Sequence, residues 1–196
     1  PLEKIRQVTA AARKHGLRAH LDGARLWNAC AATGIHPRQY AAEFDTVSVC
    51  FSKGLGTPVG SAVVGTREVI HRVVRARKMF GGAMRQSGLL AAAAIYALKH
   101  NRERMVEDHA NAKTLAQGLS KIPGLKVDAS EVETNMVFFD LEASVPVNAA
   151  QLVEKVKQRG VWVMATAPRR IRAVTHLDVE ASAIPRAVEA VRLALG

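Results

Sequence analysis

Long apolar runs are missing from this sequence of 196 residues. No uninterrupted apolar stretch approaches the roughly 20 residues that a membrane-spanning helix needs. Near the start, Lys4, Arg6, Arg13 and Lys14 interrupt the apolar positions, so no signal-peptide pattern opens the chain. The sequence therefore predicts a protein without a membrane segment, and we expect no membrane partner.

Cysteine is almost absent. Cys30 and Cys50 are the only two, and neither has the Cys-x-x-Cys or Cys/His spacing of a metal site. Both lie among apolar residues, so we expect two buried free thiols and no bound metal. Free thiols fit a reducing compartment, and on this basis we expect a cytoplasmic protein.

Acidic residues are outnumbered, because 17 Asp and Glu stand against 28 Lys and Arg, which gives a formal charge of +11. Such a surplus is common in proteins that bind nucleic acid. The densest basic stretch, residues 67–85, lacks interleaved aromatic residues on which bases could stack, and it matches no nucleic-acid-binding module. We therefore expect no nucleic-acid partner and interpret the stretch as a solvated helix face or a contact that faces a phosphate.

A starting methionine is also absent, because the chain begins at Pro1. We expect that an N-terminal portion of the natural protein precedes it. The hydrophobic share of 48% is typical of a globular protein with a real core. A chain of this length holds one full domain or parts of two.

The first third of the chain alternates between helix and strand patterns. The spacing of apolar and β-branched residues predicts helices over 2–12 and 27–32, strands over 17–21, 46–51 and 61–64, and a glycine-rich loop over 52–58. Gly16 and Gly34 are placed to end the two helices. This order of elements predicts an α/β layer built on a sheet.

After Thr66 the pattern changes to longer helices and then alternates again. It predicts helices over 67–80, 86–96, 102–119, 149–159 and 182–195, and strands over 125–127, 136–140, 161–163 and 170–174. Ser182 is a suitable N-cap for the last helix, with Pro185 in the first turn. Because the final stretch indicates a separate small α+β domain, we predict domains at 1–105 and 106–196.

Polar side chains stand where the predicted strands end. Asp22 and Arg25 follow the first strand, Lys53 follows the second, and Arg172 lies in a late strand. In an open α/β sheet, ligands bind beyond the carboxyl ends of the strands. Glycines beside Lys53 leave room for a bulky group, and a partly desolvated lysine is a better amine nucleophile. That is the chemistry needed to hold an aldehyde cofactor, although an ordinary surface lysine fits the same pattern.

Six strings carry a resemblance to one family. They are residues 20–29 (HLDGARLWNA), 51–61 (FSKGLGTPVGS), 78–88 (KMFGGAMRQSG), 107–109 (EDH), 134–136 (TNM) and 172–178 (RAVTHLD). In this order they resemble segments of the low-specificity L-threonine aldolases, which belong to the fold-type-I pyridoxal-phosphate enzymes and the β-eliminating lyase/threonine aldolase family. The resemblance runs along nearly the whole chain. It implies an α/β fold in which the C-terminal part of the cofactor-binding large domain precedes a small α+β domain.

The resemblance also implies roles for the polar residues. Lys53 would carry pyridoxal 5'-phosphate, and Asp22 would pair with the pyridine nitrogen, although N-capping of the following helix is an alternative role for Asp22. Arg25 would reach the phenolic oxygen of the cofactor or the substrate carboxylate. Arg172 would grip that carboxylate through its bidentate guanidinium, unless the register slips to the neighbouring arginines at 169 and 170.

The implied reaction is retro-aldol cleavage of L-threonine or L-allo-threonine to glycine and acetaldehyde. The implied enzyme is a lyase of glycine biosynthesis and threonine catabolism, and it is a homotetramer built from dimers. In such an assembly, Lys78 and Arg85 would face the cofactor phosphate of a neighbouring subunit. No residue stands out as the base for the β-hydroxyl proton, because His20, His109 and His176 are each explained as well by a structural role.

Three other interpretations stay open. Fold-type-I enzymes also include amino-acid racemases and β-eliminating lyases. The isolated chain could be inactive, because the family's main phosphate-binding turn and its ring-stacking histidine lie upstream of the segment at 20–29. A basic binding module is the third interpretation, for which salt-sensitive binding of nucleic acid would be the evidence.

Overall fold

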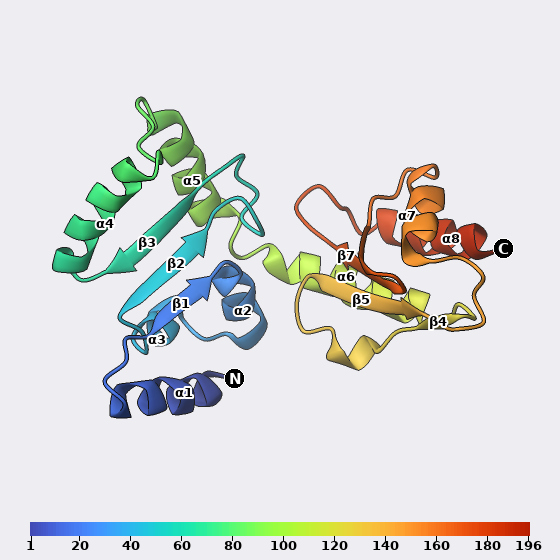
Figure 1. Cartoon of the computed structure of the whole chain (residues 1–196). Coiled ribbons are helices and arrows are strands. Elements are labelled where there is room, and N and C mark those ends of the chain that lie inside the picture. Colours follow the sequence, from blue (N-terminus) through green and yellow to red (C-terminus); the bar gives the residue numbers. More distant parts are fainter. The chain divides into compact units, whose positions relative to one another are not determined.

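The chain divides into two compact units, Pro1–Glu103 and Arg104–Gly196, in a computed structural model that describes residues 1–196 (Figure 1). Each unit consists of one sheet with helices. None of the helices combines the length and the apolar character that crossing a membrane requires.

The first unit follows the predicted order of helices and strands. Its elements are α1 (Leu2–Lys14), β1 (His20–Gly23), α2 (Leu26–Thr33), α3 (Pro37–Ala41), β2 (Thr46–Cys50), β3 (Ser61–Gly65), α4 (Arg67–Met79) and α5 (Gly88–His100). The short α3 was not predicted, because its five residues are too few to show a period. It begins at a proline after a capping box formed by His36 and Gln39.

The first predicted strand was placed too early. Residues 17–19 precede β1, because Leu17 donates its N–H to the carbonyl of Ala12 (2.9 Å) and so belongs to the C-terminal turn of α1. Gly16 makes that turn possible with a φ of 68°. As a result Asp22 lies inside β1 rather than after it.

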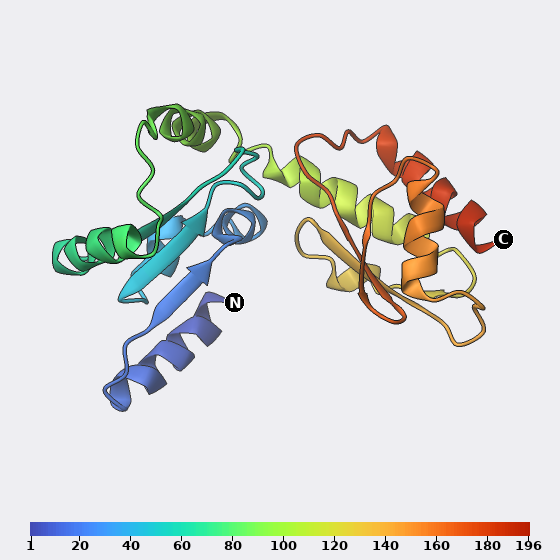
Figure 2. The same cartoon turned by 45° about the horizontal axis from the view of Figure 1, so that its top comes forward.

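The three strands of this unit form a sheet of order β1-β2-β3, in which β1 and β2 are parallel and β3 is antiparallel to β2. One face carries Val47 and Val49, which pack with Leu26 of α2 and Tyr40 of α3 into a small core. Helix α1 lies beside β1 (Figure 2) and adds Leu2 and Ile5 to that core. The helices that precede β2 therefore cover the apolar face.

The opposite face of this sheet is polar near its parallel strands. It carries His20 and Asp22 from β1, and Thr46, Ser48 and Cys50 from β2, because successive side chains of a strand point to opposite faces. The side chains of the paired residues His20 and Thr46 are 2.8 Å apart (Nδ1 to Oγ1). A sheet face of this composition is suited to a polar ligand rather than to packing.

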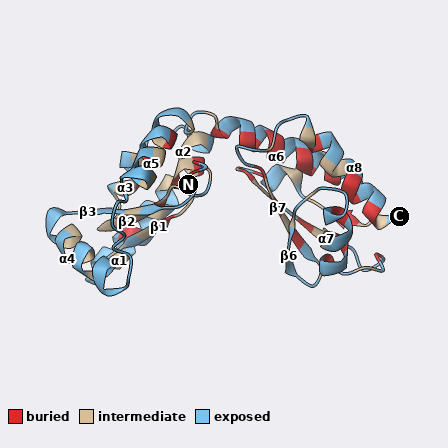
Figure 3. Ribbon diagram, turned by 90° about the horizontal axis from the view of Figure 1, so that it is seen from above, coloured by how far each residue is buried: buried red, intermediate tan, exposed pale blue.

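The second unit has a regular antiparallel sheet backed by helices. Its elements are α6 (Met105–Leu119), β4 (Leu125–Lys126), a 3-10 turn η1 (Ala129–Glu131), β5 (Met136–Leu141), α7 (Ala149–Lys157), β6 (Met164–Ala167), β7 (Arg170–Val174) and α8 (Ala183–Leu195). The sheet order is β4-β5-β7-β6. Buried residues line the sides of α6 and α8 that face their unit's core (Figure 3). Val137, Phe139 and Ile171 are the matching buried positions of the sheet.

Two details of this unit differ from the prediction. Residues 161–163 are not a strand, because Val161 donates its N–H to Val156 (3.2 Å) and closes α7 after Gly160. The strand begins at Met164 instead. Ser182 does occupy the N-cap position of α8, but its side chain makes no capping bond, and its hydroxyl lies 3.3 Å from Glu180 Oε2.

Candidate active site

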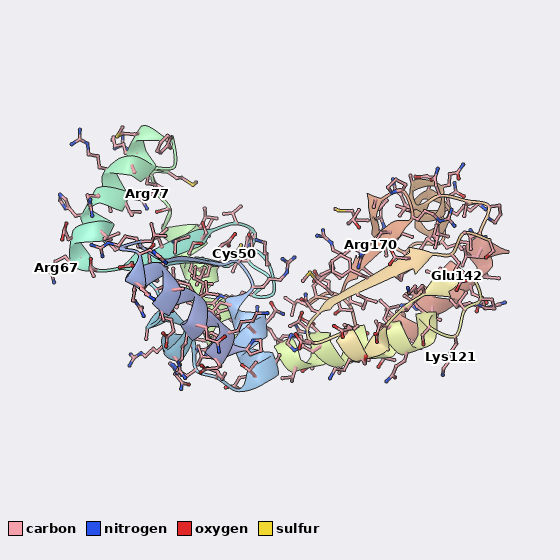
Figure 4. The ribbon with its side chains drawn as sticks, turned by 60° about the horizontal axis from the view of Figure 1, so that its bottom comes forward. Cys50, Arg67, Arg77, Lys121, Glu142 and Arg170 are labelled. Carbon is pink, nitrogen blue, oxygen red and sulfur yellow. The ribbon has the colours of Figure 1, made fainter.

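The loop that carries Lys53 closes on itself directly after β2. Phe51 N–H donates to the carbonyl of Gly60 (2.9 Å), and Gly56 N–H donates to the carbonyl of Lys53 (2.8 Å). Gly56 has a φ of 72°, a conformation that residues with a Cβ adopt only with strain. Leu55 is completely buried and anchors the loop to the body of the unit. Cys50, where the loop begins, is labelled in Figure 4.

The Lys53 side chain is exposed, and its ammonium group has no hydrogen-bond or ion-pair partner in the structure. The chain by itself therefore does not desolvate this lysine. Its freedom from partners is nevertheless what a nucleophilic amine requires, because an ion-paired lysine would have to break that pair before it reacted.

Asp22 is also available for a ligand. Its Oδ1 accepts a hydrogen bond from the backbone of Ala24 (3.1 Å), and Oδ2 has no partner in the structure. Helix α2 begins at Leu26 with Arg25 at its N-cap position, so Asp22 does not cap that helix. The side chain of Arg25 is half-buried and makes no hydrogen bond or ion pair in the structure. Three charged groups without salt-bridge partners therefore lie around the ends of the two parallel strands.

The pairing of β1 with β2 brings these groups to one edge of the sheet. The two strands are parallel, and Asp22 is the register partner of Ser48. The carboxyl ends of parallel strands meet at the same edge, so Asp22 and the Lys53 loop both lie there. A Cβ on Gly23 would stand only 2.5 Å from the carbonyl oxygen of Ser48. The absence of a side chain at Gly23 is what lets the strands approach so closely next to Asp22.

The two cysteines flank this region as free thiols. Both are half-buried rather than buried, which corrects the expectation in part. Burial raises the pKa of the Cys30 thiol. The Cys50 sulfur lies 3.3 Å from the hydroxyl of Ser52, next to Lys53. The side chains of this edge are hydroxyl, thiol and charged groups.

Arg172 lies in β7 of the second unit, on the face of the sheet that the helices leave open. It is paired in register with Phe138 and Met164, and its Nη2 lies 3.4 Å from the Met164 sulfur. Its Nε is buried and has no hydrogen-bond partner in the structure. A buried donor without an acceptor is unfavourable. The guanidinium thus has an N–H group available to donate to an anion.

The neighbouring arginines are already occupied. Arg169 donates from Nε to the carbonyl of Leu141 (2.9 Å) and from Nη2 to the carbonyls of Glu142 and Val145. Arg170, labelled in Figure 4, is 3.8 Å from the carboxylate of Asp140 and stacks over the ring of Phe138. Of these three arginines, Arg172 is the one without an oxygen acceptor.

Each of the three histidines has a local contact or a buried position of its own. His20 is engaged with Thr46, and the Nδ1 of His176 accepts the N–H of Asp178. Burial lowers the pKa of His109, which favours a neutral ring inside α6. Lys78 and Arg85 are exposed, and neither makes an ion pair in the structure.

The sequence interpretation missed a buried polar cluster that secures the end of β7. Asn135 Nδ2 donates to the carbonyl of Thr175 (2.8 Å), and the Thr175 hydroxyl donates to the carbonyl of Asp108 (2.6 Å). The Asp108 carboxylate is fully buried and is held by Arg104 (2.9 and 3.2 Å). The strings at 107–109 and 134–136 marked these positions, but only the fold shows that they meet beside the strand of Arg172.

The arrangement of the sheet and of its polar edge defines a class. An α/β unit with two adjacent parallel strands, followed by a helix-backed antiparallel sheet, is the fold that this chain shares with a solved threonine aldolase and a solved aminotransferase, the fold-type-I architecture. This confirms the expected fold class. Residues 1–142 match the family described as Beta-eliminating lyase. The chain belongs to that family.

Individual relatives agree with the family assignment. The chain is 40% identical over 181 residues to low-specificity L-threonine aldolase 1 of Arabidopsis thaliana, covering 92% of this chain and 51% of that protein. It is 45% identical over 179 residues to the low specificity L-threonine aldolase of Escherichia coli (strain K12), covering 91% and 51%. A solved threonine aldolase of Leishmania major has the same fold, with a TM-score of 0.76 at 18% identity, over 100% of this chain and 57% of that one. The chain thus spans about half the length of the curated relatives it matches.

Proposed function

We propose that the protein containing this chain is a pyridoxal-phosphate-dependent lyase that cleaves L-threonine or L-allo-threonine to glycine and acetaldehyde. The observation that carries the proposal is the pair Lys53 and Asp22, which lies at one edge of adjacent parallel strands in a member of the Beta-eliminating lyase family. Relatives at 40% and 45% identity that are named threonine aldolases support this choice of reaction.

The side chains at this edge fit the cofactor. An aldehyde requires an amine that is free to react, and Lys53 is exposed and unpaired. A pyridine nitrogen requires an acceptor that keeps it protonated, and Asp22 Oδ2 has no other partner. Arg25 supplies a positive charge for the phenolic oxygen of the cofactor or for the substrate carboxylate. When bound, pyridoxal phosphate supplies an electron sink for bond breaking at the substrate Cα.

Arg172 is proposed to bind the substrate carboxylate. Its buried Nε lacks an acceptor, whereas Arg169 and Arg170 already have oxygen partners. A carboxylate accepts two parallel N–H groups of a guanidinium and is thereby fixed in orientation. Fixing the carboxylate also fixes which bond at Cα is broken, because the substrate then has one permitted rotation.

A β-elimination or racemisation reaction on the same fold is the second candidate. The name of the matching family, Beta-eliminating lyase, favours elimination as the alternative. The discriminating feature is the fate of the Cα–Cβ bond: aldol cleavage releases an aldehyde and glycine, elimination releases a leaving group from Cβ, and racemisation releases neither.

We also propose that residues 1–105 belong to a large cofactor-binding domain and residues 106–196 to a small domain of a cytoplasmic homo-oligomer built from dimers. Exposed apolar side chains on α4 and just beyond it support self-association, since Phe80 is 88% exposed and Met79 is 71% exposed. In that assembly the basic residues Lys78 and Arg85 would reach the phosphate of a neighbouring subunit's cofactor.

Acetaldehyde release from L-threonine by the complete protein with added pyridoxal phosphate tests the function. The Lys53→Ala variant should release none, and Arg172→Lys should both raise KM and lower kcat, because an ammonium group replaces the bidentate fork that binds and orients the carboxylate. Cofactor binding without acetaldehyde would support elimination or racemisation. A wild-type protein that binds no cofactor at Lys53 would remove the proposal altogether. We expect little turnover by the isolated chain, because within the family the ring-stacking and main phosphate-binding residues lie outside it.

A further inference from the structure

One side chain outside the Lys53 loop is hydrogen-bonded to it. Asn101, at the C-cap position of α5, donates from Nδ2 to the carbonyl oxygen of Leu55 at 2.8 Å, across 46 residues of sequence. Leu55 is two residues after Lys53, and its side chain is fully buried. The contact therefore holds the backbone of the loop next to the proposed nucleophile.

Apart from the adjoining Cys50, whose sulfur lies 3.3 Å from Ser52 Oγ and 3.9 Å from the carbonyl oxygen of Gly60, no other hydrogen bond reaches residues 51–60 from another part of the fold. The remaining bonds of these residues are internal or join the two ends of the loop, such as those from Gly56 to Lys53 and from Phe51 to Gly60. Internal bonds fix the shape of a loop but not its position. Its position is fixed by the buried Leu55 side chain and by the bond from Asn101.

The residue after Asn101 contacts the helix that follows Asp22 and Arg25. The guanidinium of Arg102 lies 5.3 Å from the ring centroid of Trp27, in the helix that follows Asp22 and Arg25. Two consecutive side chains at the end of α5 thus contact the Lys53 loop and the α2 helix. The backbone there is held by the α5 hydrogen bond from Asn101 N–H to Ala97 (2.8 Å), and Ala97 is buried.

We propose that Asn101 is a positioning residue for Lys53. It keeps the loop seated so that the lysine amine stays at the strand edge beside Asp22, ready for the cofactor aldehyde. This inference rests on the proposed function only for the identity of that cofactor. Removing the side-chain NH2 group of Asn101 would leave the Leu55 carbonyl without its donor, which is costly for a buried acceptor. The loop would then be free to shift.

The sharpest variant is Asn101→Asp. It has nearly the same shape, but an acceptor oxygen replaces the NH2 donor and would face the Leu55 carbonyl. The matched control is Asn148→Asp at the N-cap of α7, where the residue uses its oxygen to accept from Gln151 (2.9 Å) and an aspartate does the same. Asn101→Ser keeps a hydrogen-bond donor, so it should loosen the loop less than Asn101→Asp does.

The first measurement is amide hydrogen exchange on the full chain without cofactor. We expect exchange at Gly56 and Thr57 to rise about tenfold in Asn101→Asp, the change for the loss of one hydrogen bond. Exchange at Val47 and Val49 in β2 should stay unchanged, which separates loosening of the loop from general destabilisation. Unchanged exchange at Gly56 and Thr57, or an equal rise at Val47 and Val49, would overturn the inference.

The second measurement is capture of pyridoxal phosphate on Lys53 by borohydride in the complete protein, read by peptide mass spectrometry. Asn101→Asp should capture several-fold less at limiting cofactor, with Asn148→Asp equal to wild type. Equal capture by wild type and Asn101→Asp would overturn the positioning role and leave the proposed function standing. No capture by the wild type would overturn the proposed function, while the exchange data would still report whether Asn101 anchors the loop.

Discussion

The two units differ in how completely each one buries its own apolar side chains. In Arg104–Gly196, twenty buried apolar residues form a single core between the sheet and helices α6, α7 and α8. In Pro1–Glu103, the cluster around the sheet has four, and α4 has no buried residue. The unit that carries Lys53 and Asp22 is therefore the one with the smaller core, and its exposed apolar surface is suited to contacts with other protein.

The largest loss of stability is expected from a substitution in the larger core, that of the second unit. Phe139 and Phe138 are neighbours in β5 that face opposite sides of the sheet, and they are 1% and 40% exposed. Phe139→Ala should lower the free energy of unfolding of the second unit by about 3–5 kcal/mol, as is typical for removing a buried aromatic ring. Phe138→Ala should lower it by far less. Hydrogen exchange of the β5 and β7 amides measures both, and equal effects would mean that the core is not where the structure places it.

The next largest effect is expected from a Gly→Ala substitution, which should destabilise the second unit at one position and leave the first unit unchanged or more stable at another. A Cβ on Gly118 of α6 would meet Val188 of α8 at 2.5 Å, so Gly118→Ala should cost about 1–3 kcal/mol through overpacking. Gly88, in α5 of the first unit, has open space around it. Gly88→Ala should therefore be neutral or should stabilise by up to about 1 kcal/mol. Thermal unfolding of both variants tests this, and destabilisation by Gly88→Ala would show that α5 is covered.

The exposed apolar surface of the first unit can be tested through self-association. Phe80→Ser, at a side chain that is 88% exposed, should weaken association about tenfold, which corresponds to about 1.4 kcal/mol, and leave stability unchanged. Trp162→Ser is the control in the second unit, where a 77% exposed indole lies beneath Lys157. Sedimentation equilibrium at several concentrations distinguishes them. An equal loss for both variants would remove the distinction between the two surfaces.

The smallest expected effect is a dependence on pH. The N–H of Ala19 and then the Arg18 guanidinium hold the pKa of Asp45 below its ordinary value. A carboxyl whose pKa is lower in the folded state stabilises above its ordinary pKa, and this contribution disappears as pH falls through the folded pKa. Asp45→Asn should thus lower the unfolding midpoint at pH 7, with the difference from wild type vanishing in acid.

Asp128 of the second unit is the matched control for this pH effect. Hydrogen bonds from Ser130, two residues away, lower its pKa as well. Because that contact joins only neighbouring residues, Asp128→Asn should change the midpoint less than Asp45→Asn does. A larger effect at Asp128 would contradict the view that Asp45 matters by joining distant segments.

Much of the fold follows from local patterns. The β-branched and aromatic residues at 46–51 and 136–140 predict β2 and β5, and the structure confirms both with small shifts at the ends. The two strand errors have a common cause. Leu17 and Val161 each follow a glycine of left-handed conformation and bond back to the preceding helix. An apolar residue after such a glycine closes the helix rather than starting a strand.

The candidate site was predictable only in its sequence-local parts. The strings at 20–29 and 51–61 point to Asp22 and Lys53, and parallel pairing of the strands brings them to one edge. Their roles, with those of Arg25 and Arg172, stay predictions. The bond from Asn101 to Leu55 and the selection of Arg172 over Arg169 and Arg170 depend on contacts between distant residues, which no local pattern contains.

The tight approach at Gly23 has a practical consequence for mutagenesis of the candidate site. Any side chain at position 23 would push β1 away from the Ser48 carbonyl and would displace the neighbouring Asp22 carboxylate. A mutant library should therefore keep Gly23 constant and place its diversity at His20, which is exposed on the same face as Asp22, and at Arg25. If residues 20–25 were all randomised, most variants would carry a side chain at position 23 and would have a displaced β1.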